Sequence, residues 1–217
     1  MLIPLVGPMV LSGWHVTGLW ARGDHADPAE FPPFDFQNFV KYLERGLWPF
    51  LVNLVSSLVL VPLVMIVLFP ALLASAGSQH HGGHAAGLVL GVLFVGMFFL
   101  QALMMLAYYF IATPLVLRAT ITQDFKSAFD FSFVKYFLSR VWKELLASMI
   151  YLFCLSLGLM VIAVCTCYIG AFFASPVVMF SWHHLQKQLY QLYLARGGDA
   201  VPLSPKLRDI PPTLPAA

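Results

Sequence analysis

A short amphipathic stretch occurs twice in this chain: residues 34–48 read FDFQNFVKYLERGLW, and residues 129–142 read FDFSFVKYFLSRVW. The Phe-Val-Lys-Tyr segment at 39–42 recurs at 133–136, and Trp48 recurs as Trp142, all at one constant offset. Similarity at a fixed offset is the signature of a repeated structural unit. We therefore treat residues 34–48, the first copy, and residues 129–142, the second copy, as an internal repeat.

Each copy has the pattern of a helix lying on a membrane surface. Helical spacing collects most apolar residues on one face, at 36, 39, 40, 43 and 47 in the first copy and at 134, 137, 138, 141 and 142 in the second. The charged residues fall mostly on the opposite face, namely Lys41, Glu44, Arg45, Lys135 and Arg140. Such a division favours the interface plane. Asp35 and Asp130 are expected to cap these helices, because a carboxylate there accepts hydrogen bonds from first-turn amides.

The composition excludes an ordinary soluble domain. The chain is 60% hydrophobic and 10% charged, with a mean hydropathy of +0.82, whereas soluble domains are about 25% charged. Its 217 residues have room for about five membrane spans of about 20 residues each. We predict an all-α integral membrane helical bundle, with about five transmembrane helices and two interfacial amphipathic helices in a parallel internal repeat.

The charged residues predict the topology. They occupy three windows, 22–45, 118–144 and 187–209, which are separated by the charge-free tracts 46–117 and 145–186. Each tract is long enough for two crossings at about 1.5 Å of rise per residue. Two crossings return the chain to the side it left, so all 12 Lys and Arg residues share one face, which the positive-inside rule assigns to the cytoplasm. We expect an outside N-terminus and a cytoplasmic C-terminus.

The expected spans cover about 1–20, 47–69, 87–112, 145–165 and 169–182. The first span contains Pro and Gly, so a re-entrant segment stays open as an alternative. The last helix should continue past Trp182 to a stop at Gly197 and Gly198. The domains are then a transmembrane domain, 1–198, with repeat one at about 34–118 and repeat two at about 129–197, and a Pro-rich cytoplasmic tail, 199–217. This tail should be extended or disordered unless a partner holds it.

The predicted outward loop, 70–86, contains a histidine group that could bind metal. His80, His81 and His84 are spaced closely enough to share a divalent ion, and imidazole suits zinc, copper and nickel. However, no acidic residue lies nearby and the loop is rich in glycine, which is typical of a flexible, solvated turn. These histidines are weak candidates, so we assign no metal site, no cofactor and no catalytic residue.

Three longer stretches resemble a known family. They are FPPFDFQNFVKYLERGLWPFLV at 31–52, ATPLVLRATITQDFKSAFDF at 112–131 and HHLQKQLYQLYLARGG at 183–198. Together they are similar to the prokaryotic polytopic membrane proteins of the domain-of-unknown-function family numbered 4013. The matching positions are Pro33, Asp35, Gly46, Pro114, Arg118, Ala128, Phe129 and Asp130, then Gln188 with Tyr190 or Gln191 with Tyr193. The resemblance implies a helical fold in a bacterial or archaeal inner (plasma) membrane, and no agreed activity, hence no catalytic residues.

We expect an accessory or scaffold subunit of a larger membrane complex, without catalytic activity. Its expected partners are membrane lipids and other membrane protein subunits or a second copy of itself. A small-solute permease or channel is the alternative, because repeats often frame transport sites and Pro62 and Pro176 should kink their helices. Against it, the spans contain no Asp, Glu, Lys or Arg, which ion-coupled carriers usually keep.

An enzyme acting on lipid headgroups is a third hypothesis. Asp35, Asp130, His183 and His184 could gather at the inner surface, but the chain contains no HExxH, no GxSxG and no phosphate-binding glycine loop. Nucleic-acid binding is disfavoured because the basic residues are matched by nearly as many acidic ones.

Overall fold

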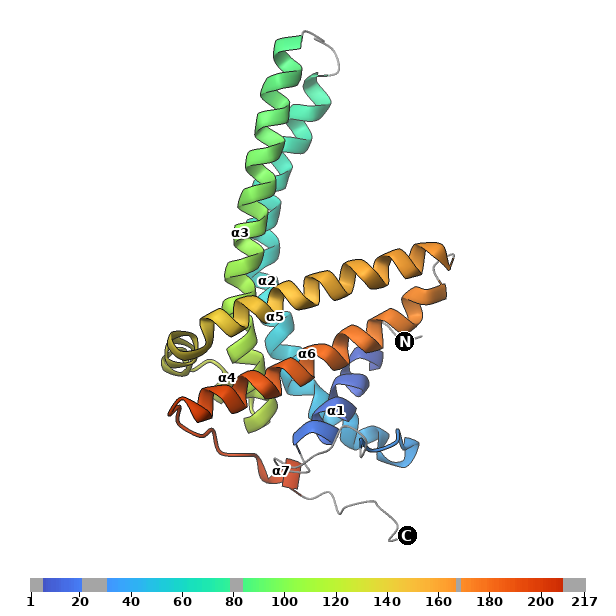
Figure 1. Cartoon of the computed structure of the whole chain (residues 1–217), viewed down its shortest axis with the longest axis vertical. Helices are drawn as coiled ribbons and strands as arrows, with labels where there is room; N and C mark the ends of the chain where they lie inside the picture. The colour runs from blue at the N-terminus through green and yellow to red at the C-terminus, as the bar shows by residue number, and fades with distance from the viewer. Residues whose placement is uncertain (1–5, 21–30, 79–83, 167–168, 209–217) are drawn as a thin grey trace. The chain divides into compact units, whose positions relative to one another are not determined.

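The computed structural model of this chain describes residues 6–20, 31–78, 84–166 and 169–208. Every regular element in these ranges is a helix, as Figure 1 shows, which confirms the all-α prediction. The elements are α1 (Val6–Trp20), the 3-10 helix η2 (Phe36–Asn38), α2 (Phe39–Ser78), α3 (His84–Thr122), α4 (Phe125–Ala128), α5 (Phe131–Cys165), α6 (Ile169–Ala195) and α7 (Pro205–Arg208).

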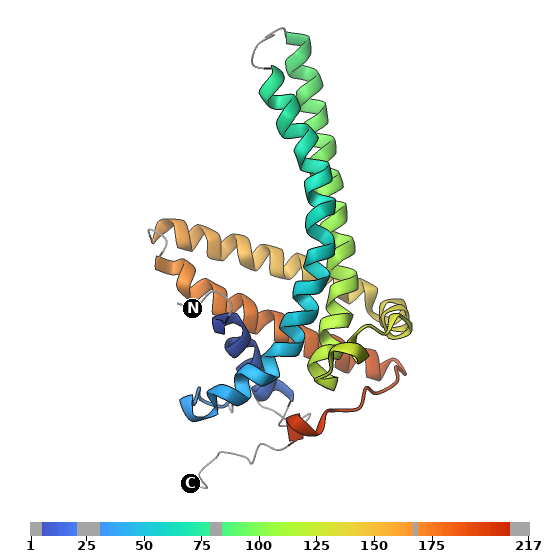
Figure 2. The ribbon, with the colours of Figure 1, turned by 180° about the vertical axis from the view of Figure 1, so that it is seen from behind.

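The chain forms two compact units. Unit 1 comprises residues 1–52 and 113–217, and unit 2 comprises residues 53–112. Unit 2 is a helical hairpin, in which the later part of α2 lies antiparallel beside the earlier part of α3 (Figures 1 and 2). The Tyr108 hydroxyl donates a hydrogen bond to the Asn53 side chain at 3.0 Å, which joins the two helices.

Two helical segments are long and apolar enough to cross a membrane. They are Phe94–Thr122 within α3 and Phe131–Cys165, with mean hydropathies of 1.9 and 2.4. By contrast, α1 has 15 residues as described, fewer than the about 20 that a crossing helix needs. Length and composition therefore support a membrane protein with at least these two candidate spans.

Several predicted boundaries agree with the structure. The predicted break after residue 165 and restart at 169 match the end of α5 and the start of α6. Helix α6 also continues past Trp182 to Ala195. The glycine stop is confirmed as well: Gly197 has φ of 78°, and Gly198 donates its amide hydrogen to the Tyr193 carbonyl at 3.0 Å.

Two helices extend beyond the spans predicted for them. Helix α3 passes through Pro114 to Thr122, whereas the predicted span covers 87 to about 112. An internal proline costs about 3 kcal/mol, but Leu115 and Leu117 are fully buried, and each contributes about 1.5–3 kcal/mol. The predicted loop at 70–86 is also helical at both ends, since α2 reaches Ser78 and α3 begins at His84. The Ala-Leu-Leu-Ala run at 71–74 has high helix propensity, which explains the longer α2.

We expected each copy to be a helix separate from the span that follows it, and this expectation was wrong. The first copy runs without a break into α2, and the second copy is the first part of α5. Helix α5 does bend at Val141, where φ is −129° and ψ is 20°, at the end of the second copy. Each copy therefore continues directly into a long helix.

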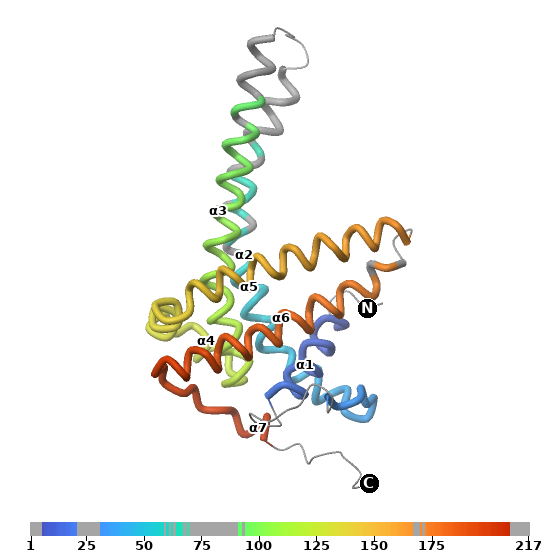
Figure 3. Tube along the Cα trace, in the orientation of Figure 1, coloured from blue at the N-terminus to red at the C-terminus, as the bar shows by residue number. Residues whose placement is uncertain are grey.

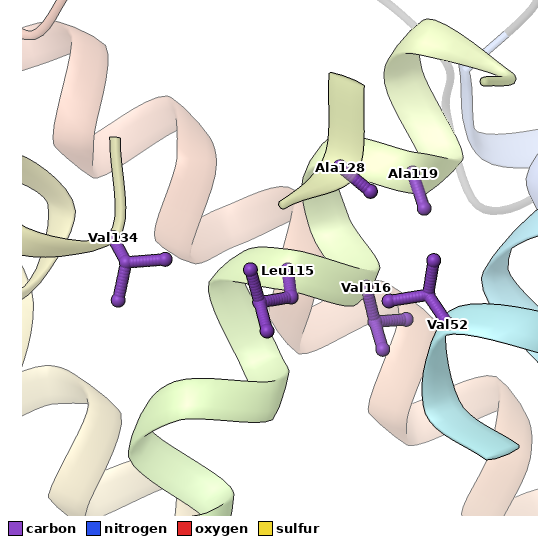
Figure 4. Packing of buried hydrophobic residues seen from close by; sticks show 6 residues of the cluster. All are labelled: Val52, Leu115, Val116, Ala119, Ala128 and Val134. Atoms are coloured by element: carbon purple, nitrogen blue, oxygen red, sulfur yellow. The ribbon is translucent and has the colours of Figure 1, made fainter. Parts of the chain in front are cut away.

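A small apolar core within unit 1 joins α2, α3, α4 and the start of α5. Val52 of α2 meets Leu115, Val116 and Ala119 of α3, and the cluster is completed by Ala128 and Val134 (Figure 4). Val52 and Ala119 are fully buried. This packing fixes the start of the second copy against the end of α3.

The chain after α6 is held by the protein itself. Figure 3 follows it from the end of α6 to α7. The Val201 amide donates to the Tyr190 hydroxyl at 2.8 Å, the Ser204 amide donates to the Ile121 carbonyl at 3.0 Å, and Leu207 is fully buried. Residues 199–208, expected to be extended or disordered without a partner, thus contact α3 and α6; residues 209–217 lie outside the described residues.

Candidate functional site: a buried polar cluster between α1 and α6

Helix α1 reaches the interior of unit 1 through a close backbone contact with α2. A Cβ atom added at Gly13 would lie 1.7 Å from the Tyr42 carbonyl oxygen, and one added at Gly46 would lie 1.8 Å from the Met9 carbonyl oxygen. Only glycine permits two helix backbones to approach so closely. This crossing brings the polar residues of α1 into the core.

Helix α1 packs against α6 (Figure 1). Four polar side chains are brought together at this contact. The Ser12 hydroxyl and Nε2 of His183 are hydrogen-bonded at 3.1 Å, and the His15 and His183 rings lie 5.6 Å apart. His15, His183 and Gln186 are 1%, 3% and 1% exposed. Gln186 follows His183 by one helical turn, on the same face of α6. We call Ser12, His15, His183 and Gln186 the α1/α6 cluster.

Aromatic rings surround the His15 imidazole. Trp14, Phe31 and Phe180 lie 5.2, 6.2 and 5.4 Å from it, centroid to centroid. Nδ1 of His15 and Nε2 of Gln186 have no hydrogen-bond partner among the described residues, whereas the His183 ring is hydrogen-bonded to the Gln186 side chain. Buried polar atoms without a partner are costly, so each of them requires an explanation.

Arg45 of α2 joins α1, α7 and the turn that follows α3. It donates to the Thr17 hydroxyl at 3.1 Å and to the Lys206 carbonyl, and its own carbonyl accepts from Gln123 at 3.3 Å. The prediction that Arg45 lies on the exposed face of the first copy was wrong, because its side chain is buried. The reason is tertiary: α1 covers this face at Gly46, and Thr17 and the 199–208 segment supply acceptors.

Arg118 and Asp130, two of the positions that resemble the family, belong to a second group of polar contacts. Arg118 pairs with Asp130 at 2.9 Å, donates to the Ser127 carbonyl at 2.7 Å, and lies 5.1 Å above the Phe133 ring. Asp124 caps α4 by accepting from the Ser127 amide at 2.8 Å, and this hydrogen bond holds the pKa of the Asp124 carboxyl below its usual value. These contacts stabilise the segment that connects α3 to α5.

None of the four headgroup-enzyme candidates, all of them described residues, has a hydrogen bond or ring contact with another candidate. Asp35 accepts from the Gln37 amide at 2.9 Å, and Asp130 accepts from the Ser132 and Phe133 amides, so both predicted caps are confirmed. His184 hydrogen-bonds Gln188 at 3.0 Å and stacks on Phe180, whereas His183 belongs to the α1/α6 cluster. The contacts of each residue are structural ones.

The histidine loop stays a prediction. His80 and His81 lie outside the described residues, and His84 begins α3. Within the part of the chain that the structure describes, no group of three or more His, Cys, Asp or Glu side chains could hold a metal ion. The His15–His183 pair was not predicted as a site, because its two histidines stand far apart in the sequence; a polar His in an otherwise apolar first segment was the only signal.

A shallow groove of about 350 Å³ runs between α5 and α6. It is mostly apolar, with Ser148, Gln188 and Glu144 among its lining residues, and the Glu144 carboxylate pairs with Arg196 at 2.6 Å. Among the described residues that line the groove, Glu144 is the only charged one.

The chain was compared with known proteins. A family profile described as a protein of unknown function (DUF4013) matches residues 1–168. No curated protein and no solved structure matches the chain. The matched region includes Ser12 and His15 and ends before His183 and Gln186.

Proposed function

The chain belongs to the DUF4013 family of proteins of unknown function, and from that premise we propose that it is a membrane-embedded accessory or scaffold subunit of a larger complex, without catalytic activity. The family assigns no reaction, so the proposal rests on how the surface is divided. Its partners are membrane lipids and other membrane protein subunits, or a second copy of the chain.

The single observation that carries the proposal is the surface of unit 2. Residues 53–112 contain no charged side chain, and large apolar side chains are exposed along both helices, including Leu58, Ile66, Phe69, Val92, Phe98 and Phe99. Keeping one such side chain in water instead of an apolar environment costs about 1.5–3 kcal/mol. A hairpin with this surface is suited to lipid or to the apolar face of another membrane protein.

The proposed topology keeps about five spans in a prokaryotic inner membrane, with the C-terminus in the cytoplasm and the N-terminus outside. Phe36 and Val40 of the first copy are exposed, and Lys41 follows them in the sequence. This combination favours the membrane interface, with rings in the acyl boundary and the cation among headgroups.

The second copy supplies a surface for a protein partner. Most of its predicted lipid face is buried inside unit 1, at Val134, Phe137 and Val141. Three large aromatic side chains of the second copy are exposed: Trp142 at the edge of that face, Phe131 and Tyr136. Exposed aromatic residues are typical anchors of protein interfaces. We infer that a neighbouring subunit covers them.

Native purification followed by mass spectrometry tests this proposal. A stoichiometric partner should copurify with the unaltered chain, and Phe131→Ser with Tyr136→Ser should remove it while the thermal unfolding midpoint in detergent stays the same. The matched control is Phe36→Ser with Val40→Ser, which alters the proposed lipid face and should leave the partner bound. Loss of the partner in both variants, or in neither, contradicts the assignment of this surface.

A small-solute permease or channel is the second candidate, and the α1/α6 cluster is the observation that favours it. Polar groups buried in apolar surroundings within membrane proteins often mark solute paths. Solute flux in proteoliposomes that contain only this chain would support the permease over the scaffold, particularly if Ser12→Ala reduced the flux. Cysteine labelling that placed residues 41 and 135 on opposite sides of the bilayer would contradict the proposed topology.

A further inference from the structure

We propose that the groove between α5 and α6, called here the α5/α6 groove, binds one phospholipid molecule. An acyl chain lies along the apolar groove, and the phosphate binds at the end where Arg140 and Arg196 are found. The inference rests on the membrane embedding in the proposed function and does not depend on the scaffold role. It assigns a specific lipid site, with its chemistry, to a chain whose lipid partners were so far named only as a class.

The size of the α5/α6 groove suits a single hydrocarbon chain. Helices α5 and α6 lie side by side (Figures 1 and 2). Each contributes a row of lining residues at helical spacing, namely Glu144, Ala147, Ser148 and Tyr151 of α5 and Leu185, Gln188, Leu189 and Leu192 of α6. The volume of about 350 Å³ is near the lower end of the range for small-molecule sites, about 300–1,000 Å³. A partner helix, about 10–12 Å wide with its side chains, would lie across the groove and not inside it.

The groove runs along a candidate membrane span. Helix α5 has a mean hydropathy of 2.4, and its large apolar side chains next to and beyond the groove, Ile150, Phe153 and Leu157, are exposed. Apolar surface of this kind is driven out of water and toward hydrocarbon. Trp142, before the groove on α5, is also exposed, and Nζ of Lys143 lies 5.7 Å from its ring. Because Trp and Lys are typical of the membrane interface, the groove extends from the interface into the hydrocarbon, as an acyl chain does.

The interfacial end of the groove has one positive charge that no carboxylate compensates. The Glu144 carboxylate accepts two hydrogen bonds from Arg196, at 3.0 and 2.6 Å, so these two charges compensate each other. Arg196 also donates to the Arg140 carbonyl, and a Cβ atom added at Gly197 would lie 3.7 Å from Nη1 of Arg140. The Arg140 guanidinium thus lies beside this pair, 5.8 Å above the Tyr193 ring.

A phosphate would compensate the charge of Arg140. None of the ion pairs among the described residues includes Arg140. The guanidinium group matches the geometry of phosphate oxygens, and hydrogen bonds between the two are charge-assisted. The α5/α6 groove therefore combines a place for a hydrocarbon chain with a cation at its interfacial end, which is the division of apolar and anionic groups within a phospholipid.

Lipid titration of the full-length protein tests the inference. The protein is delipidated in detergent and titrated with dioleoylphosphatidylglycerol, and native mass spectrometry should show one tightly retained lipid per chain. Ala147→Trp places a large ring in the groove and should weaken binding by at least about tenfold, because the ring displaces several methylene groups of the acyl chain. Ser156→Trp is the matched control: residue 156 follows nine positions later, on the opposite side of α5 by helical spacing, and the affinity should be nearly unchanged.

A second pair of variants tests the phosphate contact. Arg140→Gln should weaken binding of the same lipid about fivefold, the effect of one cation near an anionic headgroup, whereas Lys135→Gln, an exposed cation of the second copy, should have little effect. Dioleoylglycerol has the same chains without the phosphate. It should bind equally to the unaltered protein and to Arg140→Gln, which a merely structural role of Arg140 would not produce.

Three results overturn the proposal: no lipid retained by the unaltered protein, equal affinity in the unaltered protein and Ala147→Trp, or equal losses in Ala147→Trp and Ser156→Trp. If Ala147→Trp fails to fold, equal affinity in the unaltered protein and Arg140→Gln overturns it. Loss of a copurifying protein from Ala147→Trp, with no lipid on the unaltered chain, would assign the groove to a partner instead. Each of these results leaves the membrane embedding in place, whereas release of the chain from membranes by alkaline carbonate overturns the embedding itself.

Discussion

The first and second copies contain the same Phe-Val-Lys-Tyr segment, yet opposite sides of it are buried. Val40 is 72% exposed in the first copy, whereas its counterpart Val134 is 6% exposed. The tyrosines are reversed: Tyr42 is 4% exposed and Tyr136 is 58% exposed. Similar sequences therefore formed similar helices, but the helices were turned differently toward the rest of unit 1.

The neighbouring helix explains the difference. In the first copy, α1 crosses at Gly46, so the side that carries Tyr42 faces the interior. In the second copy, Phe133 and Phe137 lie 5.6 and 5.4 Å from the Tyr193 ring of α6, so the apolar side is buried. The amphipathic pattern of a helix predicts that it has two sides; the partner helix decides which side becomes core.

The largest effect should come from the buried side of the second copy. Phe137 is fully buried between Phe133 and Tyr193, so Phe137→Ala should lower the free energy of unfolding by about 3–5 kcal/mol. Phe131→Ala, on the exposed side of the same copy, should change it by less than about 0.5 kcal/mol. Denaturation in detergent measures the free energy of unfolding of both variants. Equal losses would contradict the burial of one side of the second copy.

The glycine crossing should give the next largest effect, in the first copy. Gly46→Ala would place a methyl group against the Met9 carbonyl, and we expect a loss of about 1–3 kcal/mol from overpacking. Gly158→Ala is the control, since a Cβ there meets nothing within 4 Å and helix propensity improves by about 1 kcal/mol. The thermal unfolding midpoints of the two variants should move in opposite directions.

The equivalent valines provide the most direct comparison. Val134→Ala should lower the free energy of unfolding by about 1.5–2 kcal/mol, because two methyl groups at about 0.8 kcal/mol each leave the core. Val40→Ala removes the same groups from an exposed position and should leave this free energy nearly unchanged. Denaturation of the two full-length variants in detergent measures both effects; the opposite ranking would contradict the orientation of the copies.

The two caps should differ slightly. Asp35→Ala should cost about 1 kcal/mol, the usual value for a cap. Asp130→Ala should cost up to about 1 kcal/mol more, because Asp130 also pairs with Arg118 at 2.9 Å. The expected cellular result is reduced abundance in both cases, without a defect in one activity. Asn at either position keeps a cap acceptor, and a loss equal to that of Ala would exclude capping as the cause.

The smallest effect should be a pH dependence at Asp124. Its pKa lies below the usual 3.8 because the carboxylate accepts hydrogen bonds from Ser127. A lowered pKa stabilises the fold above pH 3.8, and this contribution is lost as the pH falls through the folded-state value. The unfolding midpoint of Asp124→Asn should depend less on pH in this range. An identical acid dependence in both proteins would exclude the Asp124 cap as the cause.

The parts of the fold that depend on local signals were predictable from the sequence. Asp130 as a cap, the break near residue 165 and the glycine stop at Gly197 are each determined by a few neighbouring residues. The continuation of α3 through Pro114 was not predictable, because it depends on the packing of Leu115 against residues that are distant in the sequence, such as Val52. The α1/α6 cluster was also missed, since Ser12 and His183 are 171 residues apart in the chain.

The same separation matters during synthesis of the protein. Arg45 leaves the ribosome long before Lys206, which follows 161 residues later and supplies a carbonyl acceptor for its guanidinium. The His15 ring likewise has no neighbour from α6 until that helix has been synthesised. A nascent or truncated chain that lacks the last two helices therefore carries an arginine without its Lys206 acceptor and an imidazole without its His183 neighbour.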